Sequence, residues 1–261
     1  MRAGRRRAAP RQPEPPRGVE KQRSCKPGGT TRTWLFDLDN TLHNASHASF
    51  GGINTGMSDY IVHALSLPRD EADALRQRYW LRYGATLLGL VRHHGVDAAH
   101  FLDHTHRLPG LEQRVQGHRH DFDALARLRG RKFILTNAPR DYAERVLGAL
   151  GIRRLFDGVI SIEDMAMFGD LRPKPDARML RRVAVRLRVP PSQCVLIEDT
   201  LVHQKAARGI GMATVWMQRW TRRAARTAGN GQKVGVYLQR KPAYVCARIL
   251  SLQQLHWNRL P

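Results

Sequence analysis

Carboxylate, hydroxyl and amide side chains follow several short apolar runs of this 261-residue chain: Asp37, Asp39, Thr136, Asn137, Glu198 and Asp199. A lysine, Lys174, lies in Arg172-Pro173-Lys174-Pro175 at the start of a predicted helix. Carboxylate side chains are common proton-transfer groups in enzymes. Carboxylate oxygens also suit a hard cation such as Mg²⁺, and a lysine can offset negative charge. The set could therefore support acid/base and metal chemistry if the fold brings it together.

The elements that must position these residues are short strands that alternate with helices. Strand-sized apolar runs occupy residues 33–36, 132–135, 158–160, 194–197 and 213–216. Helical spacing occupies residues 141–150, 176–187 and 201–208. This alternation predicts an α/β fold with a buried, mostly parallel sheet. Ligands of such sheets bind outside the carboxyl ends of the strands, which is where the polar residues fall.

One stretch, residues 45–117, contains no convincing strand and is predicted to be a helical insertion after the first strand. Its longest helical pattern spans residues 71–94. One face of that helix would carry Leu75, Tyr79, Arg82, Tyr83, Leu87 and Leu90. We therefore expect a core built from residues 33–44 and 118–220, interrupted by this insertion.

The charge is concentrated at the two ends of the chain. The chain has 44 Lys and Arg against 22 Asp and Glu, a net charge of +22. Residues 1–32 carry +8, residues 33–220 carry +6, and residues 221–261 carry +8. Such a charge is typical of proteins that bind nucleic acid. The alternative to an enzyme is therefore a nucleic-acid-binding protein that acts through these basic ends. The middle is only mildly basic and shows no recognised nucleic-acid-binding module, so we do not favour that alternative.

The two ends are expected to differ in structure. Residues 1–32 are rich in Pro and Gly and are predicted to form a disordered basic arm. In the C-terminal part, residues 221–232 are predicted to be a loop, residues 243–247 an edge strand and residues 249–255 a helix. The chain shows neither a secretory signal nor an apolar run long enough to span a membrane, and its three cysteines form no CxxC pair. We expect a cytoplasmic protein without a disulfide framework, and the oligomeric state stays open.

These residues together resemble the haloacid-dehalogenase-like phosphohydrolases, whose four motifs occur here in order over residues 33–220. The segment Asp37-Leu38-Asp39-Asn40-Thr41-Leu42 resembles the first motif, D-x-D-x-T-L. The strand that ends in Thr136 corresponds to the second motif, Lys174 to the third, and Glu198-Asp199 to the fourth. A single Asp after a strand is more often a turn or cap residue, but four motifs at strand ends are specific. The resemblance implies a Rossmann-like parallel sheet core with a helical cap inserted after the first strand.

The resemblance implies a Mg²⁺-dependent phosphomonoesterase. Asp37 would attack phosphorus to form an aspartyl-phosphate, and Asp39 would protonate the leaving oxygen and then activate water. The phosphate-binding residues would be Thr136, Asn137 and Lys174. The metal ligands would be Asp37, Asp39 through its backbone carbonyl and Asp199, with Glu198 as an additional candidate. Dehalogenase members lack the carboxylate at the Asp39 position, which favours phosphate chemistry.

The same motifs are most similar to the pyrimidine 5'-nucleotidase branch, which implies UMP, CMP or a related nucleoside monophosphate as substrate. Another small phosphate monoester, such as phosphoglycolate or a sugar phosphate, is the alternative within the enzyme class. Tyr79, Trp80 and Tyr83 of the cap could stack on a base or pack in its core. We take Tyr79 and Tyr83 as the candidate substrate contacts.

Two residues depart from the family pattern. His43 follows the first motif where many relatives carry Tyr, and His203 lies four residues after Asp199 where some members place a second carboxylate. Neither change removes a catalytic group. A histidine-rich stretch over residues 93–120 is more typical of an ordinary cap surface than of a second metal site.

Overall fold

The computed structural model describes residues 32–227 and 240–255. Its centre is a six-stranded sheet of β1 (Thr33–Phe36), β2 (Arg131–Leu135), β3 (Gly158–Ile160), β6 (Cys194–Glu198), β7 (Ala213–Met217) and β8 (Ala247–Ile249). The strand order is β3-β2-β1-β6-β7-β8, and every neighbouring pair is parallel. All carboxyl ends therefore lie at one edge. The predicted α/β fold with a Rossmann-like sheet is confirmed.

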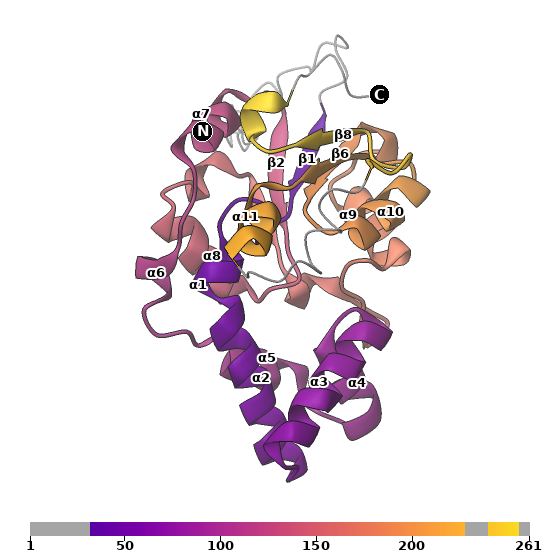
Figure 1. Cartoon of the computed structure of the whole chain (residues 1–261). Coiled ribbons are helices and arrows are strands. Elements are labelled where there is room, and N and C mark those ends of the chain that lie inside the picture. Colours follow the sequence, from indigo (N-terminus) through magenta and orange to yellow (C-terminus); the bar gives the residue numbers. More distant parts are fainter. Residues whose placement is uncertain (1–31, 228–239, 256–261) are drawn as a thin grey trace, which may run out of the picture. The chain divides into compact units, whose positions relative to one another are not determined.

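Helices cover both faces of this sheet, which explains why its strands are apolar on both sides (Figure 1). Successive side chains of β1 alternate between the faces: Trp34 and Phe36 belong to one buried cluster and Leu35 to another. On the first face α8 (Arg140–Ala149) adds Tyr142 and Val146. On the second face α9 (Ala177–Arg186) and α10 (Leu201–Gly209) pack.

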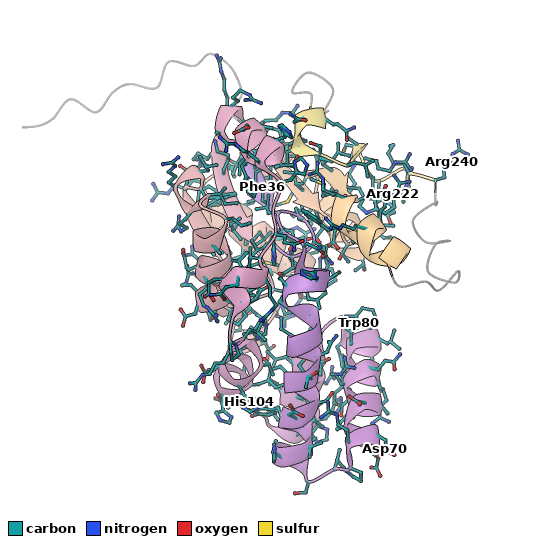
Figure 2. All side chains as sticks on the ribbon, turned by 60° about the vertical axis from the view of Figure 1, so that its left-hand side comes forward. Phe36, Asp70, Trp80, His104, Arg222 and Arg240 are labelled. Atoms are coloured by element: carbon teal, nitrogen blue, oxygen red, sulfur yellow. The ribbon has the colours of Figure 1, made fainter. Side chains whose placement is uncertain are left out.

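The segment between β1 and β2 is helical, as predicted for the cap. It contains α1 (Ala45–Ala48), α2 (Phe50–Leu65), α3 (Arg69–Tyr83), α4 (Thr86–His94), α5 (Ala98–His106), α6 (Leu111–Arg114) and α7 (Arg119–Arg127). Helices α2 to α5 enclose an apolar cluster of their own, which includes Ile61, Leu75 and Phe101. Figure 2 shows α3 running from Asp70 to Trp80, with Phe36 inside the sheet region.

The prediction of a single helix over residues 71–94 is wrong. The segment is divided into α3 and α4 at Gly84, whose φ of 78° is left-handed. Glycine adopts that conformation without a steric penalty, and it ends α3 there. The break lets α4 fold back against α3, so that Leu87 and Leu90 join the same cluster as Leu75.

A hairpin of β4 (Ala166–Met167) and β5 (Asp170–Leu171) precedes α9.

The C-terminal part of the chain differs from its prediction. Helix α11 (Arg219–Thr227) occupies residues assigned to a loop, because buried Trp220 anchors an otherwise polar segment. The last strand is Ala247–Ile249 rather than residues 243–247, and a 3-10 turn, Leu252–Gln254, replaces the predicted helix.

The basic arm falls outside the described residues except for its last residue, Arg32. The rest of the predicted loop, residues 228–232, also lies outside them. Among the described residues, we find no helix with the length and apolar character needed to span a membrane.

Candidate active site

The polar residues after β1, β2 and β6 meet at the carboxyl edge of the sheet because the strand ladders fix their positions. Asp37 continues β1 and donates its backbone N–H to the Ile197 carbonyl of β6, at 2.9 Å. Thr136 continues β2 and donates its N–H to the Ile160 carbonyl of β3, at 3.0 Å. Glu198 is the last residue of β6. These register contacts bring groups far apart in sequence to one edge.

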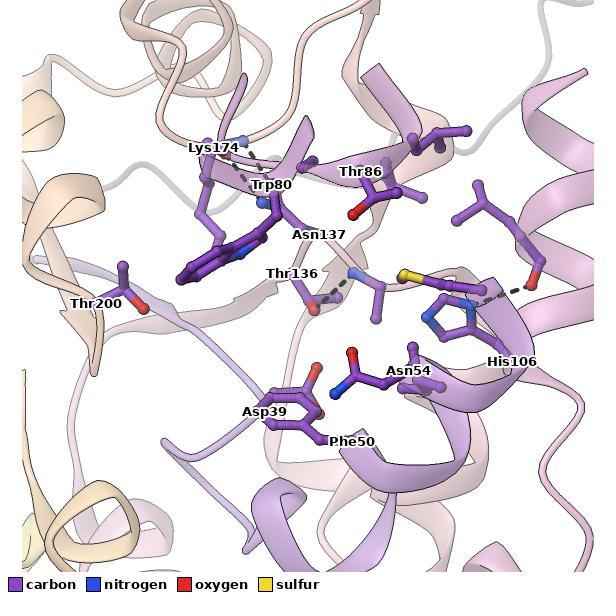
Figure 3. Close-up of a pocket in the computed structure, with 18 of the residues that line it drawn as sticks. Asp39, Phe50, Asn54, Trp80, Thr86, His106, Thr136, Asn137, Lys174 and Thr200 are labelled. Atoms are coloured by element: carbon purple, nitrogen blue, oxygen red, sulfur yellow. Dashed lines mark hydrogen bonds between the residues drawn. The ribbon is translucent and has the colours of Figure 1, made fainter. Parts of the chain in front are cut away.

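One cavity of about 670 Å³ connects this edge with the cap (Figure 3). Its sheet-side lining includes Asp37, Asp39, Thr136, Asn137, Lys174, Glu198 and Asp199. The structure therefore brings together every catalytic, phosphate-binding and metal candidate predicted from the sequence.

Lys174 is the buried centre of the charged group. Its side chain is 1% exposed, and its Nζ lies 2.7 Å from Asp37 Oδ1 and 2.8 Å from Glu198 Oε2. Burial alone would lower the pKa of Lys174, but the charges of Asp37 and Glu198 outweigh it and hold that pKa above its usual range. Lys174 is therefore a permanent cation beside the predicted nucleophile.

Asn137 fixes the backbone that carries this lysine. Its Oδ1 accepts the Lys174 N–H at 2.9 Å, and its Nδ2 donates to the Lys174 carbonyl at 3.0 Å. Both ends of the amide are thus used to hold Lys174. The backbone N–H of Asn137 is the predicted phosphate donor. The Thr136 hydroxyl accepts the Ala138 N–H at 3.1 Å, which leaves its proton for another acceptor.

The carboxylates of Asp37, Glu198 and Asp199 could hold a metal ion, since one oxygen of each lies within 4.8 Å of the others. Glu198 already binds protein donors with both oxygens. Lys174 donates to Oε2 and the Thr200 N–H donates to Oε1 at 3.1 Å, while His203 Nδ1 lies 3.2 Å from Oε2. Asp37 and Asp199 are therefore better placed to offer oxygens to a cation. Oxygen-only donors of this kind fit Mg²⁺.

The electrostatics of this carboxylate group also fit a cation. Burial and the charge of Glu198 raise the pKa of Asp37 to about 6, although Lys174 opposes them. Burial and the charges of Glu198 and Asp37 raise the pKa of Asp199 well above its usual range. The pKa of Glu198 stays well below its usual range, because the charges of Lys174 and His203 outweigh its burial. The three carboxylates thus carry more negative charge than Lys174 offsets, which a bound cation would relieve.

Asp39 lies in a different environment from Asp37. Its Oδ1 is 2.8 Å from His43 Nε2 and accepts the Tyr142 hydroxyl at 2.7 Å. Burial would raise the pKa of Asp39, but the hydrogen bonds from His43 and Tyr142 and the charge of His43 hold it below its usual range. Tyr142 was not predicted from the sequence. Its place early in α8, the helix that follows β2, was the available signal.

The cap side of the cavity corrects the predicted substrate contacts. Tyr79 and Tyr83 do not belong to its lining. Tyr79 packs in the cap cluster with its hydroxyl 2.7 Å from His94 Nε2, and the Tyr83 hydroxyl meets His93. Trp80 does line the cavity and is 58% exposed. Successive side chains of a helix are about 100° apart around its axis. Tyr79 therefore faces the cap core, whereas the next residue, Trp80, faces the cavity.

Several other cap residues were missed. The lining includes Phe50, Asn54, Arg76, Gln77, Thr86 and His106. In Figure 3, Asn54 and Trp80 extend into the same pocket as Asp39 and Lys174. The Asn54 Oδ1 accepts a hydrogen bond from Arg76 at 3.1 Å, which leaves its amide N–H₂ to face the pocket. In the described part of the chain, the one group of three potential metal ligands that lie close together is the acidic group above, and it contains no histidine.

Comparisons with known proteins agree with this geometry. The sequence pattern of the haloacid dehalogenase-like hydrolases matches residues 31–211. Phosphate metabolism protein 8 of Saccharomyces cerevisiae is 24% identical over 210 residues, 76% of this chain and 64% of that protein. Validoxylamine A 7'-phosphate phosphatase of Streptomyces hygroscopicus subsp. limoneus is 35% identical over 82 residues, 31% of this chain and 36% of that protein.

Both matches cover less than two thirds of the relative's own length. Among solved structures, a HAD phosphatase from Thermococcus onnurineus superposes with a TM-score of 0.55 at 20% identity. That alignment covers 86% of this chain and 95% of the other. At this level of identity the likeness supports the fold alone.

Proposed function

Because this chain belongs to the haloacid dehalogenase-like hydrolase family, we propose that it is a Mg²⁺-dependent phosphomonoesterase acting on pyrimidine nucleoside 5'-monophosphates. The observation that carries the proposal is the buried contact of 2.7 Å between Lys174 and Asp37 at the rim of a cavity that Asp39 also lines. A nucleophile, a fixed cation and a separate acid/base carboxylate are the three groups that phosphate ester cleavage requires.

Asp37 acts as the nucleophile. Its oxygen bonds to phosphorus while the bond from phosphorus to the ester oxygen breaks, and the leaving oxygen takes a proton from Asp39. A water then gives a proton to Asp39 as its oxygen attacks phosphorus, and the bond to Asp37 breaks to release phosphate. Lys174 offsets the negative charge of the phosphoryl oxygens, which the Thr136 hydroxyl and the Asn137 N–H bind.

Asp37 and Asp199 would hold Mg²⁺, with Glu198 beside them. The carbonyl of Asp39 stays a predicted further ligand. When bound, the cation supplies positive charge to the carboxylates and phosphoryl oxygens. Asp39 also separates this chemistry from carbon–halogen cleavage, which forms an ester at the nucleophile but needs no proton donor for a departing halide.

The cap side of the cavity supports a nucleoside as leaving group. Trp80 offers an exposed indole for a planar base, and the Asn54 amide offers donors to ring carbonyl oxygens such as those of uracil and cytosine. The name of the Streptomyces relative describes a phosphatase of another small phosphate ester. A sugar phosphate or phosphoglycolate is therefore the competing substrate.

The test is phosphate release by the purified full chain with Mg²⁺ from a panel of UMP, CMP, AMP, GMP, phosphoglycolate and sugar phosphates. We expect the highest kcat/KM for UMP or CMP. Asp37→Asn, which keeps the side-chain shape, should abolish release while the circular dichroism spectrum stays unchanged. Turnover by that variant near the wild-type rate would overturn the mechanism. Preference for a sugar phosphate would overturn the substrate assignment alone.

A further inference from the structure

The carboxylate of Asp39 is held on one side by a buried hydrogen-bonded chain that the proposed reaction does not use. Its Oδ1 lies 2.8 Å from His43 Nε2 and 2.7 Å from the Tyr142 hydroxyl. The Tyr142 hydroxyl in turn lies 2.8 Å from Ser49 Oγ. His43 and Tyr142 are buried, and Ser49 is also enclosed. Two polar groups thus converge on a single carboxylate oxygen, and a third supports one of them.

The direction of these hydrogen bonds follows from counting protons. An ionised carboxylate only accepts, so the single proton of Tyr142 goes to Asp39. The Tyr142 oxygen is then free to accept from Ser49. The ring nitrogen of His43 that faces Asp39 is Nε2, which must carry the proton for the same reason. The other ring nitrogen, Nδ1, is buried and has no hydrogen-bond partner within the described residues.

The two oxygens of Asp39 therefore differ. Oδ1 receives two donors, whereas Oδ2 receives no hydrogen bond from the described part of the chain. The Asp39 side chain is 19% exposed, and the residue lines the cavity with Asp37. An unrestrained aspartate can turn its carboxylate and exchange its oxygens, because rotation about χ2 is broad and roughly two-fold. Here that rotation would break the hydrogen bonds to His43 and Tyr142, whose side chains are buried.

We propose that His43 and Tyr142 are positioning residues that commit Oδ1 of Asp39 to the protein, so that Oδ2 exchanges the proton with the leaving oxygen and with water. Ser49 extends the arrangement by orienting the Tyr142 hydroxyl. The inference rests on the proposed function, in which Asp39 is the acid/base group. It adds which atom transfers the proton and which residues hold it in place.

Neither His43 nor Tyr142 needs to touch the substrate for this role. Both approach Asp39 through Oδ1, and neither belongs to the lining of the cavity. The ring of Tyr142 packs in the apolar cluster of the sheet face, which limits the movement of its hydroxyl. Rigid support of this kind matters because a misplacement of about 1 Å can reduce a rate by about 10²-fold.

The test compares two leaving groups in Tyr142→Phe, which removes the hydroxyl and keeps the buried ring. The 5'-oxygen of UMP needs a proton as it departs, whereas p-nitrophenolate does not. The quantity measured is kcat/KM, which reports steps up to departure of the leaving group and excludes hydrolysis of the aspartyl-phosphate. We expect kcat/KM for UMP to fall about 10- to 100-fold, and that for p-nitrophenyl phosphate to fall less than about 3-fold.

Tyr60→Phe is the matched control. Tyr60 is also buried, and its hydroxyl also meets a histidine, His100 Nδ1 at 3.0 Å, but it lies in the cap cluster outside the cavity lining. This control should leave both kcat/KM values unchanged. Thermal unfolding of both variants, followed by circular dichroism, shows whether each remains folded at the assay temperature.

A second pair of variants tests the other donor. His43→Gln keeps an N–H donor of similar reach, and His43→Leu removes it. The leucine variant should show the same dependence on leaving group as Tyr142→Phe, and the glutamine variant should recover part of the loss. Equal losses for UMP and p-nitrophenyl phosphate in both Tyr142→Phe and His43→Leu would overturn the positioning role.

The outcome for the wild-type chain separates this inference from the proposed function. Absence of Mg²⁺-dependent phosphate release from every monoester would overturn both. Release from another alkyl phosphate in place of UMP would overturn only the proposed substrate, and that ester then replaces UMP in the comparison. A wild-type enzyme active on UMP, with no leaving-group effect in the variants, would overturn only the positioning role.

Discussion

The sheet edge and the cap each contain a group of interacting charges, and the two groups differ in burial. At the sheet edge, Lys174 lies between Asp37 and Glu198, and all three side chains are at most 8% exposed. In the cap, Asp73 of α3 contacts Arg69, Arg76 and the Ser58 hydroxyl of α2, and its side chain is 46% exposed. One group is enclosed in the core, and the other is open to water.

This difference is what we expect if the group at the sheet edge serves the proposed reaction and the group in the cap joins two helices. Desolvation of a buried ion pair can exceed its attraction, so such a pair is weak evidence of a stabilising role. The charges at the sheet edge are better explained by a reaction that needs a fixed cation beside a nucleophile. The pairs in the cap contribute little to stability because water screens them. Substitutions in the two regions should therefore have effects of very different size.

Lys174→Met should have the largest effect. Losing the cation beside the phosphoryl group should reduce kcat about 10²- to 10³-fold, the range found when one charge-stabilising donor is removed. The substitution also leaves Asp37 and Glu198 buried without their counter-charge. Breaking a buried pair in this way costs about 3–5 kcal/mol of unfolding free energy. Phosphate release and urea unfolding at neutral pH measure the two losses.

Two further variants show whether the burial of Lys174 is the cause. Lys205→Met removes an exposed lysine of α10 and should change neither quantity. In the double variant Lys174→Met with Glu198→Gln, the loss of one uncompensated carboxylate should restore part of the stability but none of the activity. If Lys174→Met is as stable as Lys205→Met, the buried charges of the sheet edge do not have the energetic role described above.

Mg²⁺ should stabilise the wild-type chain through the carboxylates of the sheet edge. A ligand at a hundred times its Kd adds about 2.7 kcal/mol to the stability of the folded state, which corresponds to a rise of several degrees in Tm. Asp199→Asn should abolish the rise. Without Mg²⁺ this variant should melt no lower than wild type, because it removes a carboxylate that lies beside Glu198 and Asp37.

Asp103→Asn removes an exposed carboxylate of α5 that pairs with Arg107 and serves as the control for this experiment. Its Tm should rise with Mg²⁺ as in wild type. An undiminished rise in Asp199→Asn would place the cation elsewhere. Differential scanning fluorimetry with and without Mg²⁺ measures these shifts independently of any activity.

The sheet side of the site could be predicted from the sequence because strand topology determines it. Once five apolar runs are assigned to a parallel sheet, the residues after them must meet at one edge. The positions of Asp37, Thr136 and Glu198 could therefore be predicted without knowledge of side-chain packing. The strands of the six-stranded sheet were predicted to within about a residue, except for the last one, whose apolar pattern is short and irregular, and the short hairpin of β4 and β5 was not predicted. The structural roles of Asn137 and Glu198 as partners of Lys174 became visible only from distances.

The cap side could not be predicted in the same way. Which residues of a helix face the cavity depends on how the helix is rotated against its neighbours, and tertiary packing decides that. The break at Gly84 changed the packing of α4, and Tyr79 packs in the cap core whereas Trp80 lines the cavity. Tyr142 was missed for a related reason: its contact with Asp39 spans 103 positions and no motif marks it.

Trp80→Ala tests whether the cap side recognises a base. Stacking of one base on an aromatic side chain is worth about 1–3 kcal/mol, so KM for UMP should rise at least about 5-fold. Inhibition by inorganic phosphate should stay unchanged, because phosphate reaches only the sheet-side groups. Leu81→Ala, at the neighbouring exposed position outside this cavity, is the control. A rise in the phosphate inhibition constant equal to that in KM would show that Trp80 acts on the sheet edge instead.

Asp73→Asn should have the smallest effect and tests the exposed group of the cap. The hydrogen bond from Ser58 lowers the pKa of Asp73, and the charges of Arg69 and Arg76 add to this against a small effect of burial. A lowered folded-state pKa contributes stability that is present above the ordinary value of 3.8 and is lost as the pH falls through the folded-state value.

Because these side chains are exposed, we expect Asp73→Asn to lose less than about 1 kcal/mol of unfolding free energy at neutral pH. Urea unfolding at neutral pH and near pH 3 should show this difference shrinking with acidity. A loss as large as that of Lys174→Met would mean that the open charges of the cap are as important to the fold as the enclosed charges of the sheet edge.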